Sequence, residues 1–289
     1  MATSVETPPS TVIERRSGLT PRDFARDYLY RNRPVVLVDA ISSWPALTQW
    51  TLDGLRSRFT GRDVVIKGKT YRFEEFIDLI LRADPANPAP YMNQEVISKT
   101  FPELLADMRP LPWCFAPNWL PGSYPIRYID QWFNLGAELE LFIGSKGSGL
   151  HTLHYDHLHL HAFSVQIQGT KRFFLYPPEQ TQFLYATKNF AGINDVVNPD
   201  LQRFPLFAQA KPIVYDLQAG EVLFVPSGWW HDTRLLTDSV SVSINTACAS
   251  NWAKVRADVC RDVRPKLRFL AWCLLTGIGL LRRAQRPAA

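Results

Sequence analysis

Histidines are concentrated in one short stretch of this 289-residue chain. Five of the six lie within eleven residues, namely His151, His154, His157, His159 and His161. Successive residues of an extended strand point to opposite faces, so residues i and i+2 share a face. In the stretch His154-Tyr155-Asp156, an imidazole nitrogen and a carboxylate oxygen would therefore lie side by side, an arrangement that can bind a metal ion.

The one histidine outside this stretch, His231, could supply a third ligand. It ends the segment 220–231 (GEVLFVPSGWWH), which reads as a turn, an apolar strand, a second turn and an aromatic pair. Two histidines and one carboxylate on one face of an octahedron are typical of non-haem Fe(II) and leave three positions open. We therefore predict that His154, Asp156 and His231 bind a catalytic iron. The alternative is that His154 and Asp156 form a solvated or hydrogen-bonded pair.

The remaining residues of the histidine stretch alternate. His157, His159 and His161 are predicted to share one strand face, opposite to that of the metal ligands. We favour hydrogen-bonded strand histidines over a second metal site, and His159 and His161 remain candidates for the substrate pocket.

Two tryptophans, Trp229 and Trp230, adjoin His231. Because neighbouring strand residues face opposite ways, we expect one of them to line the site and the other to lie in the core.

Composition narrows the class of protein. Hydrophobic residues make up 46% and charged residues 20%, which suits a globular domain with a large core. The net charge of +5 is scattered and gives no strong nucleic-acid signal. Four widely spaced cysteines without a CxxC pair exclude a disulfide framework as the organising principle. No secretory signal is evident in residues 1–10, so a cytoplasmic location is expected.

The elements that must position these residues change in character along the chain. Residues 1–12 are expected to be a flexible tail, and residues 13–125 a helical and strand support. A helix is predicted from the cap Thr20 to about Tyr30, and another over 73–81. From about residue 138, short strands are predicted at 139–143, 159–168, 172–176, 212–216, 221–225 and 239–246. They indicate a barrel or jelly roll over 126–250.

The C-terminal segment 251–289 is predicted to be helical. Residues 269–281 form an apolar run of thirteen residues with basic residues on both sides, too short to span a bilayer alone. We favour a buried or dimer-forming helix, which predicts a homodimer. The alternative is that residues 266–286 lie on a membrane surface.

Five stretches together resemble a known family. They are RPVVLVDAISSWPALTQWT (33–51), YMNQEVISKTFPEL (91–104), LHYDHLHLHAFSVQIQGTKRFFLYPP (153–178), AGEVLFVPSGWWHDTRLL (219–236) and VSINTA (242–247). The chain resembles the JmjC/cupin-like Fe(II)- and 2-oxoglutarate-dependent oxygenases over roughly residues 17–250. The likeness is greatest to the small protein hydroxylases, such as the asparaginyl hydroxylase that inhibits hypoxia-inducible factor. The resemblance implies a double-stranded β-helix, mainly β, with a helix-rich N-terminal portion and C-terminal helices.

The resemblance also implies roles for residues outside the iron triad. Lys171 resembles the lysine that pairs with the distal carboxylate of 2-oxoglutarate, and Tyr91 resembles a tyrosine whose hydroxyl bonds the same group. Asn245 resembles an asparagine near metal and cosubstrate. Taken alone, these residues would read as a turn lysine, a buried aromatic and a capped turn. The family usually has Ser or Thr where this chain has His151, so Thr152 is the nearest hydroxyl for the cosubstrate.

By resemblance, the expected cofactors are Fe(II), 2-oxoglutarate and O2. The expected reaction is hydroxylation of a protein or peptide side chain, with release of succinate and CO2. Three alternatives stay open: a non-catalytic cupin-like binding module, an N-methyl demethylase, and a hydroxylase of RNA or of a small molecule.

Overall fold

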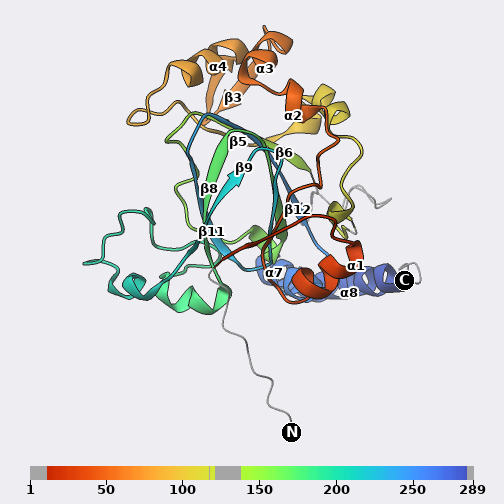
Figure 1. The fold of residues 1–289 in the computed structure, drawn as a ribbon. Helices are drawn as coiled ribbons and strands as arrows, with labels where there is room; N and C mark the ends of the chain where they lie inside the picture. The colour runs from red at the N-terminus through yellow and green to blue at the C-terminus, as the bar shows by residue number, and fades with distance from the viewer. Residues whose placement is uncertain (1–11, 117, 121–137, 285–289) are drawn as a thin grey trace.

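Two β-sheets face each other in the computed structural model, which describes residues 12–116, 118–120 and 138–284 (Figure 1). The large sheet contains, in spatial order, β1 (Glu14–Arg16), β2 (Val35–Leu37), β10 (Val222–Val225), β7 (His161–Gln168), β12 (Ser239–Thr246), β6 (Leu139–Gly144) and β5 (Met92–Val96). The small sheet contains β11 (Trp230–Leu235), β8 (Thr170–Tyr176) and β9 (Ile213–Gln218). Strands β3 (Asp63–Ile66) and β4 (Lys69–Arg72) form a separate hairpin.

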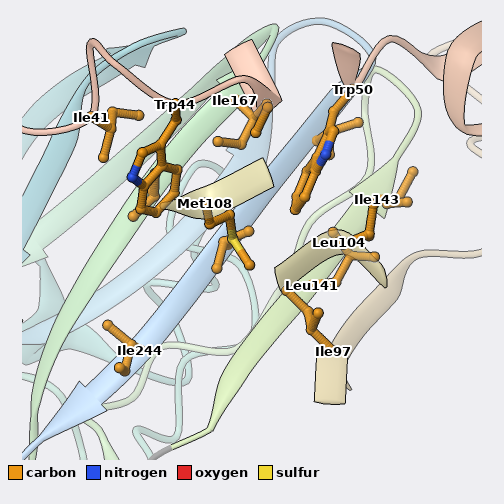
Figure 2. Close-up of a cluster of buried hydrophobic side chains, with 14 of the residues drawn as sticks. Ile41, Trp44, Trp50, Ile97, Leu104, Met108, Leu141, Ile143, Ile167 and Ile244 are labelled. Atoms are coloured by element: carbon orange, nitrogen blue, oxygen red, sulfur yellow. The ribbon is translucent and has the colours of Figure 1, made fainter. Parts of the chain in front are cut away.

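Alternation along the strands separates the two faces of the large sheet. On its inner face, Leu223 and Val225 of β10 join a hydrophobic cluster with Phe173 and Leu175 of the small sheet. On the outer face, the alternate residues join a larger cluster with the N-terminal helices. Figure 2 shows part of this outer core, where Leu141 and Ile143 of β6 lie near Trp50 and Leu104. The sheets thus form a sandwich with the N-terminal half packed on its outside.

Short helices make up this N-terminal layer. They are α1 (Pro21–Phe24), the π-helix η1 (Ala25–Leu29), α2 (Ala46–Gln49), α3 (Leu52–Arg58), α4 (Phe73–Arg82), α5 (Ile97–Thr100), and the 3-10 helices η2 (Pro102–Met108) and η3 (Trp113–Phe115). The Thr20 side chain accepts a hydrogen bond from the Asp23 amide at 3.1 Å, which confirms the predicted cap. The helix predicted over 73–81 is confirmed as α4, whose buried residues share one face.

The remaining helices follow or interrupt the barrel. They are the 3-10 helices η4 (His157–His159), η5 (Pro178–Phe183), η6 (Pro205–Gln209) and η7 (Pro265–Leu267), and the α-helices α7 (Trp252–Asp262) and α8 (Arg268–Ala284). Helices α7 and α8 pack together at the opposite end of the molecule from α4 (Figure 1). Most of the predicted tail and the predicted start of the barrel, residue 126, lie outside the described residues.

Two expectations about the histidine stretch are wrong. His154-Tyr155-Asp156 is not part of a strand, although His154 forms an isolated bridge. His157, His159 and His161 do not share a strand face, because Leu158 and His159 have φ of 59° and 53° and the chain turns there before β7 begins. A contact from a distant segment holds this turn: the side chain of Asn251, the residue before α7, donates to the His159 carbonyl at 3.0 Å. Such long-range contacts leave no periodic signal in the sequence.

A strand of the small sheet was also missed. Residues 230–235 form β11, which pairs with β8, whereas the sequence predicts no strand between the ranges 221–225 and 239–246. Asp232 is completely buried, and its carboxylate accepts from the Thr233 amide at 2.7 Å and from Arg234 Nη1 at 2.7 Å. These local hydrogen bonds allow a charged residue inside a buried strand.

Candidate metal centre

A backbone bridge sets His154 against His231. The His154 amide donates to the His231 carbonyl at 3.1 Å, and the His231 amide donates to the His154 carbonyl at 2.6 Å. Their ring centroids are 4.4 Å apart. The pairing joins the loop before η4 to the start of β11. It therefore brings together two imidazoles that are far apart in the sequence.

Asp156 completes the group. Its Oδ2 lies 3.9 Å from His231 Nε2, and one ligand atom from each of the three residues lies within 4.8 Å of the others. Asp156 is the residue that immediately precedes η4. The three side chains predicted as iron ligands are therefore brought together, though not by the strand geometry expected.

Hydrogen bonds fix which nitrogen of each histidine is free. Nδ1 of His154 lies 2.9 Å from the Thr152 carbonyl, and Nδ1 of His231 lies 3.1 Å from the Trp229 carbonyl. A carbonyl oxygen only accepts, so Nδ1 carries the hydrogen in both rings and Nε2 keeps its lone pair for a metal. Burial, together with the nearby His231, lowers the pKa of His154 and favours the neutral, ligating form.

Lys171 lies further along the same inner surface. It pairs across the ladder with Leu235, four residues beyond His231 on β11. Its side chain is buried, with 4% of the residue exposed, and Nζ donates to Ser241 Oγ. Burial lowers its pKa to about 7. No salt bridge joins Lys171 to a carboxylate within the described part of the chain, so this buried site is suited to an anionic ligand.

Tyr91 lies in the same apolar corner. It forms a cluster with Phe142 and Leu235, and Lys171 Nζ is 5.0 Å from the Phe142 ring centroid. The Tyr91 hydroxyl is buried and has no hydrogen-bond partner among the described residues. Burial raises its pKa, so it remains a donor. A buried cation and an orphaned hydroxyl in one corner fit a ligand carboxylate.

Comparison with known proteins decides the family. Residues 21–252, most of the chain, match the model of the cupin-like domain. The chain belongs to the cupin-like family. The family resemblance and the predicted β jelly roll with helices are both confirmed.

Curated relatives of this cupin-like chain carry different names. It is 30% identical to HSPB1-associated protein 1 of Rattus norvegicus over 91% of this chain and 57% of that protein. It is 29% identical to tRNA wybutosine-synthesizing protein 5 of Gallus gallus over 82% of this chain and 77% of that protein. It is 30% identical to lysine-specific demethylase JMJ30 of Arabidopsis thaliana over 80% of this chain and 54% of that protein. The chain thus spans little more than half the length of two of these relatives.

The two other residues predicted to bind the cosubstrate, Asn245 and Thr152, differ in whether their side chains have a partner. Asn245 is on β12, and its Oδ1 is buried without a partner among the described residues. Thr152 turns its hydroxyl to the Leu150 carbonyl at 3.3 Å, so it is engaged locally. The contribution of Thr152 seen here is its carbonyl, which orients the His154 ring.

The predicted substrate-pocket residues are mostly tied into the core. Trp229 and Trp230 belong to different hydrophobic clusters, in keeping with their opposite directions. Each indole N–H is paired at 2.8 Å, with the Asn32 carbonyl and Thr181 Oγ1 respectively. Trp229 belongs to the same cluster as Leu175, which pairs with His231 across the ladder. Trp229 therefore lies on the same face of the small sheet as the metal group.

The two candidate histidines contact α7 and the residues just before it. His159 Nδ1 lies 2.5 Å from Asp258 Oδ2 on α7, and His161 Nε2 lies 2.8 Å from Ser250 Oγ. Burial lowers the pKa of His161 to about 3, so this residue is neutral. These contacts give both side chains a structural partner, and neither joins the three-residue metal group.

Three residues of the inner face were not predicted as site residues from the sequence. Thr233 follows His231 by two residues on β11, and its Oγ1 is buried without a partner in the described structure. Ser241 holds Lys171. Glu140 lies near Asp156, and burial, then the Asp156 charge, raises its pKa to about 7. A charged residue within the predicted strand 139–143 was the available signal for Glu140.

Proposed function

We propose that this chain is an Fe(II)- and 2-oxoglutarate-dependent oxygenase that hydroxylates a protein or peptide side chain. The observation that carries the proposal is the group His154, Asp156 and His231, with both Nε2 atoms free and both Nδ1 atoms held by backbone carbonyls. Two neutral imidazoles and one carboxylate, with no thiolate, are the donor set of non-haem ferrous sites. The residues present therefore fit the ion that the family resemblance implies.

The chain's other inner-face residues would bind 2-oxoglutarate. Lys171 supplies a cation and Tyr91 a hydroxyl donor for the distal carboxylate, at the end of β11 away from His231. Leu235 and Phe142 surround them and keep water out. A charge-assisted hydrogen bond in such a surrounding is stronger than in water, so the cosubstrate is held in one orientation with its other end toward the metal ligands.

When bound, iron supplies the redox chemistry by which O2 and 2-oxoglutarate yield succinate, CO2 and a hydroxyl group on the substrate. The residues around it orient the reactants. The carbonyls of Thr152 and Trp229 hold the imidazoles in the ligating tautomer, and Asp156 offsets the charge of the ion.

Demethylation is the second candidate. One relative is named a lysine-specific demethylase, and the same iron chemistry applied to an N-methyl group would release formaldehyde. The intact triad and the buried Lys171 support catalysis over a binding module without activity. A protein or peptide substrate is proposed over RNA, because the charge pattern gives no strong nucleic-acid signal.

The test is turnover of 2-oxoglutarate by the purified chain with Fe(II) and a cell-extract protein digest. We expect substrate-dependent succinate, and a mass increase of one oxygen atom on a peptide. His154→Ala should abolish both, whereas His157→Ala, an exposed histidine three residues away, should retain them. Formaldehyde release would indicate demethylation. Equal succinate from the wild type and His154→Ala would contradict the proposal.

A further inference from the structure

Helix α8 (Arg268–Ala284) covers α7 with only one of its sides. Its buried residues Ala271, Leu275 and Ile278 lie on one face, and the indole of Trp252 donates to the Leu275 carbonyl at 2.8 Å. A Cβ at Gly279 would lie 2.7 Å from the Trp252 ring, so the two helices approach closely there. This contact fixes which side of α8 faces outward.

The outward side of α8 carries no charge. At about 100° per residue, an arc of about 120° faces away from α7. It contains, in angular order, Phe269, Leu280, Cys273, Gly277, Leu270 and Leu281. Thr276 lies at its edge, where its hydroxyl accepts a hydrogen bond from Arg256 of α7 at 2.8 Å. Phe269 is 77% and Leu280 62% exposed. A helix that borders water ordinarily has a charged or polar outer face, so this face is suited to an apolar partner.

Basic residues stand at both ends of this apolar face. Residues 263–283 contain five cations and no acid, and the cations are Arg264, Lys266, Arg268, Arg282 and Arg283. Nη2 of Arg282 is buried, so Arg283 is the exposed cation at the C-terminal end of α8. Pairing of two copies of α8, whether parallel or antiparallel, would bring cations against cations, which costs free energy. An anionic lipid surface instead attracts both ends and accepts Phe269 and Leu280 between its acyl chains.

We propose that α8 lies flat on an anionic lipid surface, with its apolar arc inserted and its basic ends on the headgroup phosphates. In the described part of the chain, no helix has the length and hydropathy to cross a bilayer. The docked helix would be connected to the metal-ligand turn through α7, whose Asp258 lies 2.5 Å from His159. The inference does not depend on the proposed reaction.

Flotation of the full chain with vesicles tests this proposal. We expect the protein to float with phosphatidylcholine vesicles that contain about 30 mol% phosphatidylglycerol, and to float at least about tenfold less with pure phosphatidylcholine. Phe269→Glu with Leu280→Glu should abolish flotation. The matched control, Leu79→Glu with Leu81→Glu, alters exposed apolar residues of α4 at the opposite end of the molecule and should float normally (Figure 1).

A second pair of variants tests the charge. Lys266→Gln with Arg268→Gln should reduce flotation several-fold, whereas Lys67→Gln with Lys69→Gln on the distant β3–β4 hairpin should not. Circular dichroism would verify that each variant is folded. Absence of flotation of the wild type would overturn the proposal. A second result would also overturn it. If the wild type binds no lipid but forms a dimer by light scattering, and Phe269→Glu with Leu280→Glu makes it monomeric, then a second copy of the chain covers the apolar face.

Discussion

The two faces of strand β12, in the large sheet, are made from opposite kinds of residue. On β12, the outer face carries Val240, Val242 and Ile244, and the inner face carries Ser241, Ser243 and Asn245. The outer residues pack against the N-terminal helices in the largest hydrophobic cluster (Figure 2). The inner residues face the surface that also holds Lys171.

This difference separates stability from function. Burial of apolar side chains on the outer face stabilises the fold by roughly 25 cal/mol per Å². Burial of polar groups on the inner face gives no such gain unless they are paired. Gln166 Nε2 donates to Ser239 Oγ at 2.6 Å, but Gln166 Oε1, the Tyr91 hydroxyl and Asn245 Oδ1 find no partner in the described structure. We infer that the outer face around β12 maintains the fold. The polar part of the inner face, beside the apolar cluster that contains Leu223 and Val225, is reserved for ligands.

The largest effect is expected from truncating the outer face. Leu141→Ala should lower the free energy of unfolding by about 2–5 kcal/mol, because it leaves a cavity in the main cluster. Ser243→Ala, the inner-face comparison on the neighbouring strand, should change it by less than about 0.5 kcal/mol. Urea unfolding measures both. Equal losses would show that the two faces contribute alike and that the comparison is wrong.

Removal of the buried cation should weaken cosubstrate binding without weakening the fold. Lys171→Met should reduce the affinity of the Mn(II)-loaded protein for 2-oxoglutarate by about 10- to 100-fold, because a charge-assisted hydrogen bond is lost. Its free energy of unfolding without ligand should stay equal or rise, since a buried amine is removed. Calorimetry and urea unfolding measure the two quantities. An unchanged affinity for 2-oxoglutarate would show that Lys171 does not bind the distal carboxylate of the cosubstrate.

The affinity for 2-oxoglutarate should also depend on pH through Lys171. Burial lowers the pKa of this lysine to about 7 in the ligand-free protein, so the cation is present below pH 7 and is lost above it. Binding of the dianion needs the cation. The affinity should therefore fall as pH rises from 7 to 9, by up to about tenfold per pH unit, with proton uptake on binding. Calorimetry in two buffers measures both, and a flat profile would refute the assignment.

The smallest effect is expected at Tyr91. Tyr91→Phe should reduce 2-oxoglutarate affinity about 3- to 10-fold, the worth of one hydrogen bond. Stability without ligand should not fall, since the buried hydroxyl has no hydrogen-bond partner among the residues that the structure describes. A loss of stability with unchanged affinity would assign the hydroxyl to the fold instead of the ligand.

Much of the fold was predictable because its strands and its best helix follow simple periods. Strands β6, β8 and β12 and helix α4 appear near the predicted ranges. The turn at 157–159 was not predictable, because positive φ at Leu158 and the hydrogen bond from Asn251 depend on distant contacts. Strand β11 was missed because its charged residues Asp232 and Arg234 pair with each other on the face of the small sheet opposite to His231.

The metal group was predictable in its membership but not in its geometry. Residue types and the resemblance pointed to His154, Asp156 and His231, yet the backbone bridge between the two histidines replaces the expected strand. Thr233 was not predicted as a site residue, because its position on the inner face follows only from the pairing of β11 with β8. The pairing of strands determines which face of a sheet a side chain occupies, and this pairing is not encoded in the local sequence pattern.

Titration with Mn(II) tests the central claim most directly. The wild type should bind one ion per chain, and His231→Ala should lose affinity on the order of 100-fold or more, while His157→Ala binds normally. Both variants should unfold at similar urea concentrations. Equal binding by the wild type and His231→Ala would contradict the claim that these three side chains share one metal ion.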